Sequence, residues 1–223
     1  MTADTIERPP EAPARKRAGR KPAVVDRATD YATRVLSGRI IAGPNVRNAC
    51  ARHLRDIHEG PARGLTWSAQ HAAEGIAFFE EILCLNGGQF EGLPFILQPW
   101  QAFIVGSIYG WRNGSVRRFR VCYVETGKGS GKSPLAAGIG MKGLTADGEN
   151  RAEIYAAATK KDQAMILFRD AVAMYQQSPE LTAASPAAAP AKTSGTSATA
   201  RPAASFAPSA PTTAKAALAP MWP

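Results

Sequence analysis

Cysteine is scarce in this chain, and long hydrophobic runs are missing. The three cysteines, Cys50, Cys84 and Cys122, stand far apart in the sequence. Single, scattered cysteines are typical of proteins in reducing compartments, so we expect no disulfide framework. No apolar stretch reaches the roughly 20 residues that a membrane-spanning helix needs, and the N-terminus lacks the apolar segment of a secretion signal. We therefore expect a cytoplasmic protein without a membrane span.

Acidic residues are absent from residues 182–223, which consist mostly of Ala, Pro, Ser and Thr. Such a segment buries too little apolar surface to offset the loss of chain entropy, so we expect a disordered tail. Residues 1–29 are also rich in Pro, Ala and charge, and we expect a disordered basic leader. Its basic run, Arg15 to Lys21, suits either a nucleic-acid-binding arm or a solvated leader. The lack of interleaved aromatic residues slightly favours the solvated leader.

The rest of the chain has the composition of a folded protein. Hydrophobic residues make up 45% of the 223 residues, which is enough for one ordinary domain with a core. The formal net charge is +9, and the pI is near 9.8. This charge suits a polyanionic partner.

Residues 30–88 predict a small helical layer. Apolar residues recur at helical spacing in three stretches, and Gly or Pro follows each of them. The expected helices cover residues 31–36, residues 45–58, and a stretch from Thr66 or Ser68 to about Leu85. The adjacent acids Glu80 and Glu81 do not face each other on a helix, so we expect both to be solvated.

Cys50, His53 and His58 suit either a metal site or core packing. The spacing lacks the second ligand pair that zinc sites use. Cys50 and His53 also share the apolar face of the expected helix. Packing is therefore favoured.

Residues 89–181 predict the strands and helices of an α/β domain. Pro99 opens an expected helix that carries Trp100 and Phe103. A β-prone run ends at Val124, a glycine-rich loop follows, and a helix continues from Pro134. A second strand at 153–157 leads into a long helix that ends near residue 177. Two strands joined through a helix make a βαβ unit, so we expect a parallel sheet.

The glycine-rich loop has the pattern of a phosphate-binding loop. A strand precedes it and a helix follows it, which is the context that such a loop requires. Glycines let successive N–H groups point into one concavity, and the helix dipole adds positive potential there. Lys132 is expected to reach the β- and γ-phosphates, and the Ser133 hydroxyl to hold Mg²⁺. The expected nucleotide-binding residues are Thr126, Gly127, Lys128, Gly129, Ser130, Gly131, Lys132 and Ser133; Thr126 stands where the usual pattern has glycine.

Other polar residues of this region leave alternatives open. Gln101 lies upstream of the loop, and its amide could read adenine or simply face solvent beside Trp100. The arginines of residues 117–120 could bind phosphate or cover a strand edge. Asp170 follows an apolar run like that of a magnesium-binding strand. We expect a helix there instead, because the helical period continues through the run.

Residues 30–181 resemble the large terminase subunit of tailed bacteriophages, an ATPase that packages DNA. The Pro-Trp-Gln and Gly-Lys-Ser blocks are the most specific part of this resemblance. The blocks that carry it are Ala51–Asp56, Phe78–Glu80, Phe95–Gln101, Arg117–Arg120, Gly127–Pro134 and Tyr155–Ala164.

The resemblance implies a partial P-loop NTPase sheet with an N-terminal helical layer, an ATP site and Mg²⁺. It implies that Gln101 recognises adenine, that Lys132 and Ser133 act on phosphate and Mg²⁺, and that Lys128 senses the γ-phosphate. The implied function is ATP-driven packaging of double-stranded DNA into the prohead by a homo-oligomer. The implied partners are the DNA, the small terminase subunit and the portal protein.

The sequence also departs from that family. The second magnesium motif, an apolar strand that ends in Asp-Glu, and the nuclease domain do not occur before the foreign tail begins. We therefore expect a truncated gene product that hydrolyses ATP poorly. The alternatives are an inactive nucleotide- or DNA-binding fragment and an unrelated small P-loop kinase or helicase fragment. The kinase alternative would need a lid with catalytic arginines, which is not visible after residue 134.

Overall fold

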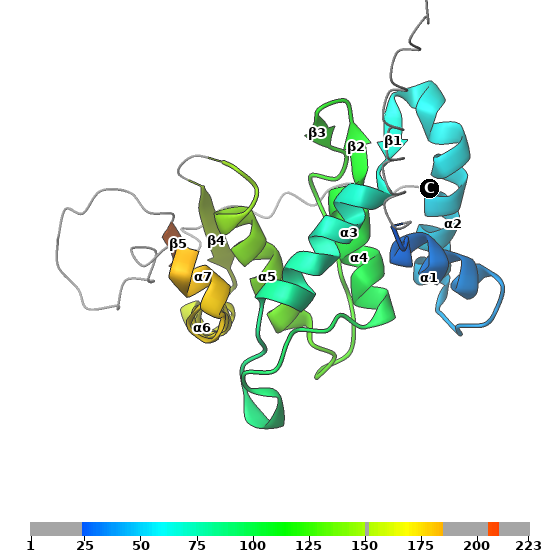
Figure 1. Ribbon diagram of the computed structural model, residues 1–223. Coiled ribbons are helices and arrows are strands. Elements are labelled where there is room, and N and C mark those ends of the chain that lie inside the picture. The colour runs from blue at the N-terminus through cyan, green and yellow to red at the C-terminus, as the bar shows by residue number, and fades with distance from the viewer. Residues whose placement is uncertain (1–23, 150–151, 185–204, 210–223) are drawn as a thin grey trace, which may run out of the picture.

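Helices dominate the fold, and two small sheets accompany them (Figure 1). The computed structural model describes residues 24–149, 152–184 and 205–209. Most of the leader and most of the tail therefore lie outside the described residues. No described helix combines the length and the apolar character needed to cross a membrane. The mixture of helices and sheets is compatible with the expected α/β class.

The N-terminal layer is built from α1 (Arg27–Leu36) and α2 (Pro44–Glu59). The leader ends earlier than the predicted residue 29, because Asp26 caps α1: its Oδ1 accepts a hydrogen bond from the N–H of Thr29 at 2.9 Å. Pro44 begins α2, as its fixed φ favours. The second helix thus lies where the sequence predicts it.

The third predicted helix is shorter than expected. It comprises α3 (Ala69–Ala77), which Ser68 caps, and the wider turn η2 (Phe78–Ile82). It ends before Leu85, because the backbone of Leu83 is extended and its carbonyl accepts a hydrogen bond from the N–H of Phe95 at 2.9 Å. A short helical turn, η3 (Gly88–Phe90), lies within the excursion that follows.

A small antiparallel sheet links this region to the next helix. Pro99 opens α4 (Pro99–Gly110) as predicted. The sheet was not predicted, and its strand order is β1-β2-β3. Its strands are β1 (Leu65–Trp67), β2 (Trp111–Asn113) and β3 (Val116–Arg117). The helical turn η1 (Gly60–Arg63) precedes β1. Since β1 and β2 come from opposite sides of residue 88, the two predicted regions are joined by strand pairing.

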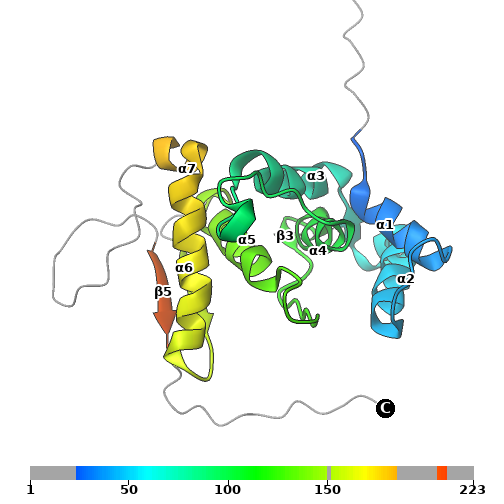
Figure 2. The ribbon, with the colours of Figure 1, turned by 90° about the horizontal axis from the view of Figure 1, so that it is seen from below.

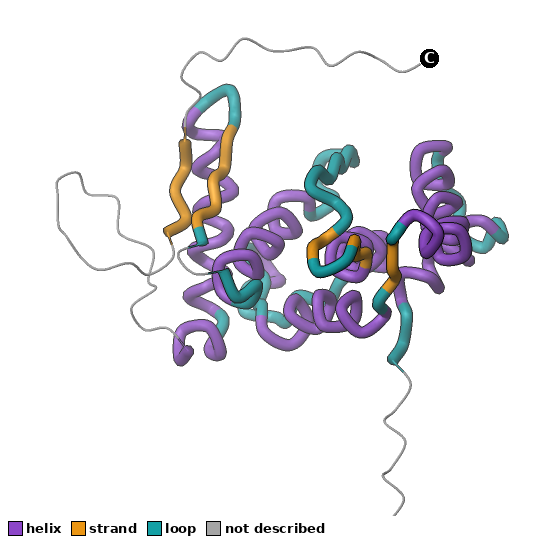
Figure 3. The backbone as a smooth tube through the Cα atoms, turned by 90° about the horizontal axis from the view of Figure 1, so that it is seen from above, coloured by secondary structure: helices purple, strands orange, loops and turns teal. Residues whose placement is uncertain are grey.

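The C-terminal part contains a parallel two-stranded sheet beside helices (Figures 2 and 3). Its elements are α5 (Lys132–Thr145), β4 (Glu153–Ala157), α6 (Lys161–Gln177), α7 (Pro179–Ala184) and β5 (Ser205–Ser209). The prediction of a wholly disordered 182–223 is wrong at α7 and at β5, which pairs with β4. Strand pairing uses backbone groups, and a biased composition does not reveal it.

The prediction of a strand that ends at Val124 is also wrong. Residues 121–124 form no strand, and the side chains of Val121 and Tyr123 are each 84% exposed. A strand needs the backbone of a neighbour, and among the described strands β4 pairs with β5 alone. The predicted parallel pairing of 121–124 with 153–157 is therefore absent from the described part of the chain.

Two apolar clusters hold the helices together. The smaller one lies between α1, α2 and α4 and contains Val35, Cys50 and Phe103. The larger one joins α3, η2, α4, α5 and α6 around residues such as Phe79 and Met174, both fully buried. Thus α5, which follows the glycine-rich loop, is packed on the same core as α4.

Gly138 allows this close packing of α5, and an alanine there is expected to destabilise the protein. A Cβ atom at Gly138 would lie 2.3 Å from Cε1 of the buried Phe79. We expect Gly138→Ala to cost about 1–3 kcal/mol in urea unfolding, although alanine favours helices. Gly143→Ala is the matched control in α5, since its Cβ would meet the flexible end of Ile154 at 3.2 Å and, at the ordinary contact distance of 3.8 Å, Oδ2 of Asp147. Equal stabilities of the two variants would contradict the prediction.

Candidate functional site

The glycine-rich loop leads directly into the start of α5. Gly129 and Gly131 have φ values of 80° and 83°, a left-handed conformation that glycine adopts readily. Gly131 is the N-cap residue, and no side chain caps the helix. The first N–H groups of α5 and the positive end of its dipole therefore face the loop, an arrangement that suits an anion.

The polar side chains of the loop are turned onto its own backbone. The Lys132 Nζ donates to the carbonyl of Thr126 at 2.8 Å, and the Ser130 Oγ donates to the carbonyl of Gly127 at 2.9 Å. Lys132 and Ser133 are both exposed, as is Lys128. The ammonium group thus lies across the loop and is accessible to a ligand that approaches from solvent.

Gln101 lies against this loop. The sequence could not establish this contact, because Gln101 is far from the loop along the chain. A Cβ atom on Gly131 would lie 3.2 Å from the Nε2 of Gln101. Gln101 is only 4% exposed, and its Oε1 accepts a hydrogen bond from the N–H of Gln98 at 2.9 Å. The surface-glutamine alternative is therefore wrong, because the amide is buried between the start of α4 and the end of the loop.

Gln98 is a residue that the sequence analysis missed. The backbone N–H of Gln98 donates a hydrogen bond to the amide oxygen of Gln101. Gln98 is also the N-cap residue of α4, so this bond satisfies one of the free donors of the helix start. The Gln-Pro-Trp-Gln spacing, with a glutamine three residues after the cap, is the signal that could have found it.

Two of the arginines before the loop are engaged in ion pairs inside the protein. The Arg117 guanidinium lies 2.5 Å from Oδ2 of Asp147, and the Arg118 guanidinium lies 2.6 Å from Oδ2 of Asp56. Arg120 is exposed. The phosphate and edge-covering alternatives therefore remain open for Arg120, whereas Arg117 and Arg118 serve structural pairs.

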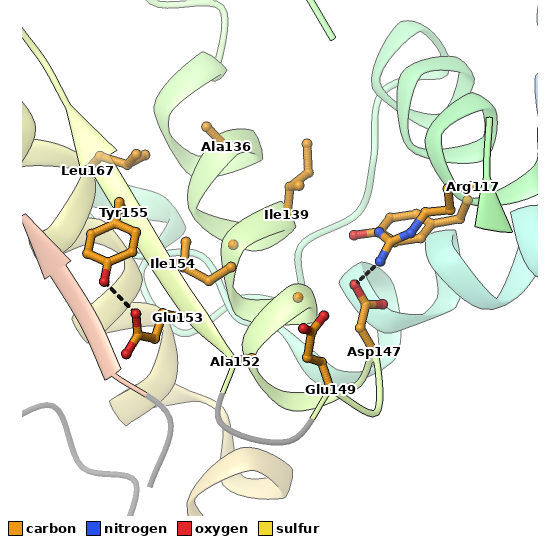
Figure 4. Close-up of a pocket in the computed structure, with 13 residues that line it drawn as sticks. Arg117, Ala136, Ile139, Asp147, Glu149, Ala152, Glu153, Ile154, Tyr155 and Leu167 are labelled. Carbon is orange, nitrogen blue, oxygen red and sulfur yellow. Dashed lines mark hydrogen bonds and ion pairs between the residues drawn. The ribbon is translucent and has the colours of Figure 1, made fainter. Parts of the chain in front are cut away.

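A cavity of 690 Å³ lies along α5, away from the loop (Figure 4). The Arg117–Asp147 ion pair lines it on one side, and the Tyr155 hydroxyl donates to Glu153 on the other. Burial raises the pKa of the Tyr109 hydroxyl on its wall, and the charge of Asp147 adds to this effect. None of the predicted nucleotide-binding residues lines the cavity, so it is separate from the candidate site.

Packing, as predicted, accounts for Cys50 and His53 of α2, whereas His58 is exposed. Cys50 is fully buried, and His53 is 3% exposed and hydrogen-bonded to Trp111. Within the described ranges, no group of three or more His, Cys, Asp or Glu side chains could hold a metal ion. Asp170 lies inside α6 and accepts a hydrogen bond from Asn86 at 3.2 Å, so the prediction of a helix there is confirmed.

Comparison with known families supports the resemblance found in the motifs. Residues 99–187 match the family model of the terminase large subunit, ATPase domain. The match begins at the Pro-Trp-Gln block and includes the whole loop and α5. The blocks before residue 99 lie outside it. No curated protein and no solved structure matches the chain.

Proposed function

From the similarity of residues 99–187 to the ATPase domain of the terminase large subunit, we propose that this chain binds ATP at the start of α5 as part of a DNA-packaging motor. The observation that carries the proposal is the loop of residues 126–131, which ends at a left-handed Gly131 on an uncapped helix start. An ATPase domain implies the use of ATP, typically with Mg²⁺.

The residues of the loop fit a nucleotide phosphate. The backbone N–H groups at the start of α5 bind phosphate oxygens, and Lys132 exchanges the Thr126 carbonyl for the β- and γ-phosphates. Lys128, exposed on the loop, senses the γ-phosphate. The exposed Ser133 hydroxyl would hold Mg²⁺, which supplies charge neutralisation between phosphate oxygens.

Gln101 contributes from the other side of the loop. It recognises adenine while its Oε1 keeps the hydrogen bond from the N–H of Gln98, because the amide oxygen has a second lone pair and the Nε2, which lies against Gly131, carries two N–H donors. An amide that both donates and accepts matches the edge of adenine, which does the same.

The wider role follows from the family. The motor uses ATP to move double-stranded DNA into a prohead, and it works as a homo-oligomer with the small terminase subunit and the portal protein. The formal net charge of +9 supports a polyanionic partner. The chain would carry the nucleotide-binding part of this machine in the host cytoplasm.

Replacing Lys132 with alanine tests the ATP site. We expect the affinity for MgATP, measured by isothermal titration calorimetry, to fall roughly 10- to 150-fold, because one charge-assisted phosphate contact is lost. Lys160→Ala is the matched control, since Lys160 is an exposed lysine at the start of α6. The proposal fails if both variants bind MgATP as tightly as the wild type.

A further inference from the structure

The backbone of Leu97 is held on both sides by two side chains from distant parts of the chain. The Glu80 Oε1 accepts a hydrogen bond from the N–H of Leu97 at 3.0 Å, and the Arg27 Nη2 donates one to the carbonyl of Leu97 at 3.0 Å. Arg27 and Glu80 are themselves paired at 2.7 Å. The prediction that Glu80 is solvated is therefore wrong, because Arg27, 53 residues earlier, binds it. Glu81 is exposed, as predicted.

This clamp, formed by Arg27 and Glu80 on Leu97, is next to the start of α4. Leu97 is 2% exposed, and the following residue is Gln98, the N-cap of α4. Both hydrogen-bonding groups of the Leu97 backbone are fixed, so the direction from which the chain enters α4 is fixed as well. Helix α1, which carries Arg27, packs beside α4 (Figure 1).

A short series of contacts leads from the clamp to the glycine-rich loop. The N–H of Gln98 binds Oε1 of Gln101, and Nε2 of the same amide lies against Gly131. A buried amide held at its oxygen has little freedom to move its nitrogen. The position of Gly131, and with it the start of α5, therefore depends on where Gln98 lies.

We propose that Arg27 and Glu80 are positioning residues for the phosphate loop: by clamping Leu97, they hold Gln101 against Gly131 and keep the loop in the shape that binds nucleotide. This inference rests on the proposed ATP site. Neither residue belongs to the expected nucleotide-binding set. The N-terminal helical layer would thus set the nucleotide affinity of a loop about 100 residues further along the chain, by contacts between packed residues.

A double-mutant cycle on the full chain tests the proposal, with MgATP as the probe and calorimetric affinity as the readout. Arg27→Ala and Gln101→Ala are each expected to weaken binding about tenfold, and the double variant is expected to be little worse than either, as residues of one network behave. Arg34→Ala is the matched control in α1, since the one ion pair of its side chain within the described part of the chain is an exposed pair with Asp30 at 3.7 Å. It should leave affinity unchanged and be additive with Gln101→Ala.

A second pair of variants, at Glu80, tests the proposal independently if Arg27→Ala folds poorly. Glu80→Gln retains an oxygen for the N–H of Leu97 but removes the charge facing Arg27, whereas Glu80→Ala removes both. We expect MgATP affinity to fall in the order wild type, Glu80→Gln, Glu80→Ala, at temperatures where all three give the same circular dichroism spectrum.

The outcomes separate the two proposals. If Lys132→Ala weakens binding but the Arg27 and Glu80 variants bind like Arg34→Ala, the clamp does not position the loop and this inference is overturned. Full additivity of Arg27→Ala and Gln101→Ala overturns it as well. If Lys132→Ala itself has no effect, the ATP site fails, and the inference fails with it.

Discussion

Replacing Asp56 with alanine is expected to lower the free energy of unfolding by about 3–5 kcal/mol, because it removes a buried carboxylate and leaves the partly buried Arg118 guanidinium without its partner. Asp56 is 1% exposed and receives hydrogen bonds from Arg63 at 2.5 Å and from Arg118 at 2.6 Å. The Arg118 side chain is only 15% exposed. Burial raises the pKa of the Asp56 carboxyl, but the hydrogen bonds and charges of the two arginines outweigh it and hold the pKa below its ordinary value.

Asp56→Ala should lower the urea concentration at the unfolding midpoint. The slope of the unfolding free energy against urea concentration should stay unchanged. Glu59→Ala is the control three residues along α2, since Glu59 is 66% exposed and lies 3.8 Å from Arg55. Exposed pairs of this kind contribute about 0–1 kcal/mol. Similar midpoints for the two variants would show that the Asp56 pair does not hold α2 to the segment after β3.

The stability of the N-terminal layer is expected to fall by about 3 kcal/mol as the pH drops through the titration range of His53. The ring is 3% exposed, and burial lowers its pKa from 6.5 to about 4; Asp26 and Asp56 oppose this effect, and Arg118 adds to it. The Nδ1 accepts from the Trp111 indole at 3.0 Å, so the proton lies on Nε2, which faces the Thr29 hydroxyl at 3.0 Å. Protonation of Nδ1 would break the bond to Trp111.

The sign follows from the two pKa values. Because the pKa of His53 is lower in the folded state, the unfolded chain binds more protons between pH 6.5 and about 4. The stabilisation is therefore complete above pH 6.5 and is lost as the pH falls towards 4. The measurement is the difference in unfolding free energy between wild type and His53→Gln across this range. His71→Gln, at an exposed histidine, is the control, and equal slopes for all three proteins would contradict the assignment.

The local pattern of the sequence was enough to locate α2 and α4 and to place the glycine-rich loop before a helix. Each of these depends on residues close together in the chain. Pro44 and Pro99 begin their helices. The φ values of Gly129 and Gly131 are those that only glycine adopts readily, so the loop needs its glycines whatever surrounds it. Helical periodicity likewise identified Asp170 as a helix residue.

Pairing between distant segments was decided only by the tertiary structure. The run at 121–124 has the composition of a strand but forms none, and β5 forms in a segment whose composition predicted disorder. A strand is stabilised by the backbone of its neighbour, which no local pattern names. The same holds for Glu80, bound by Arg27, and for Gln101, held against Gly131. The sequence alone determined that a glycine-rich loop precedes α5; folding determined what holds it there, because those contacts join residues that the chain brings together only when it packs.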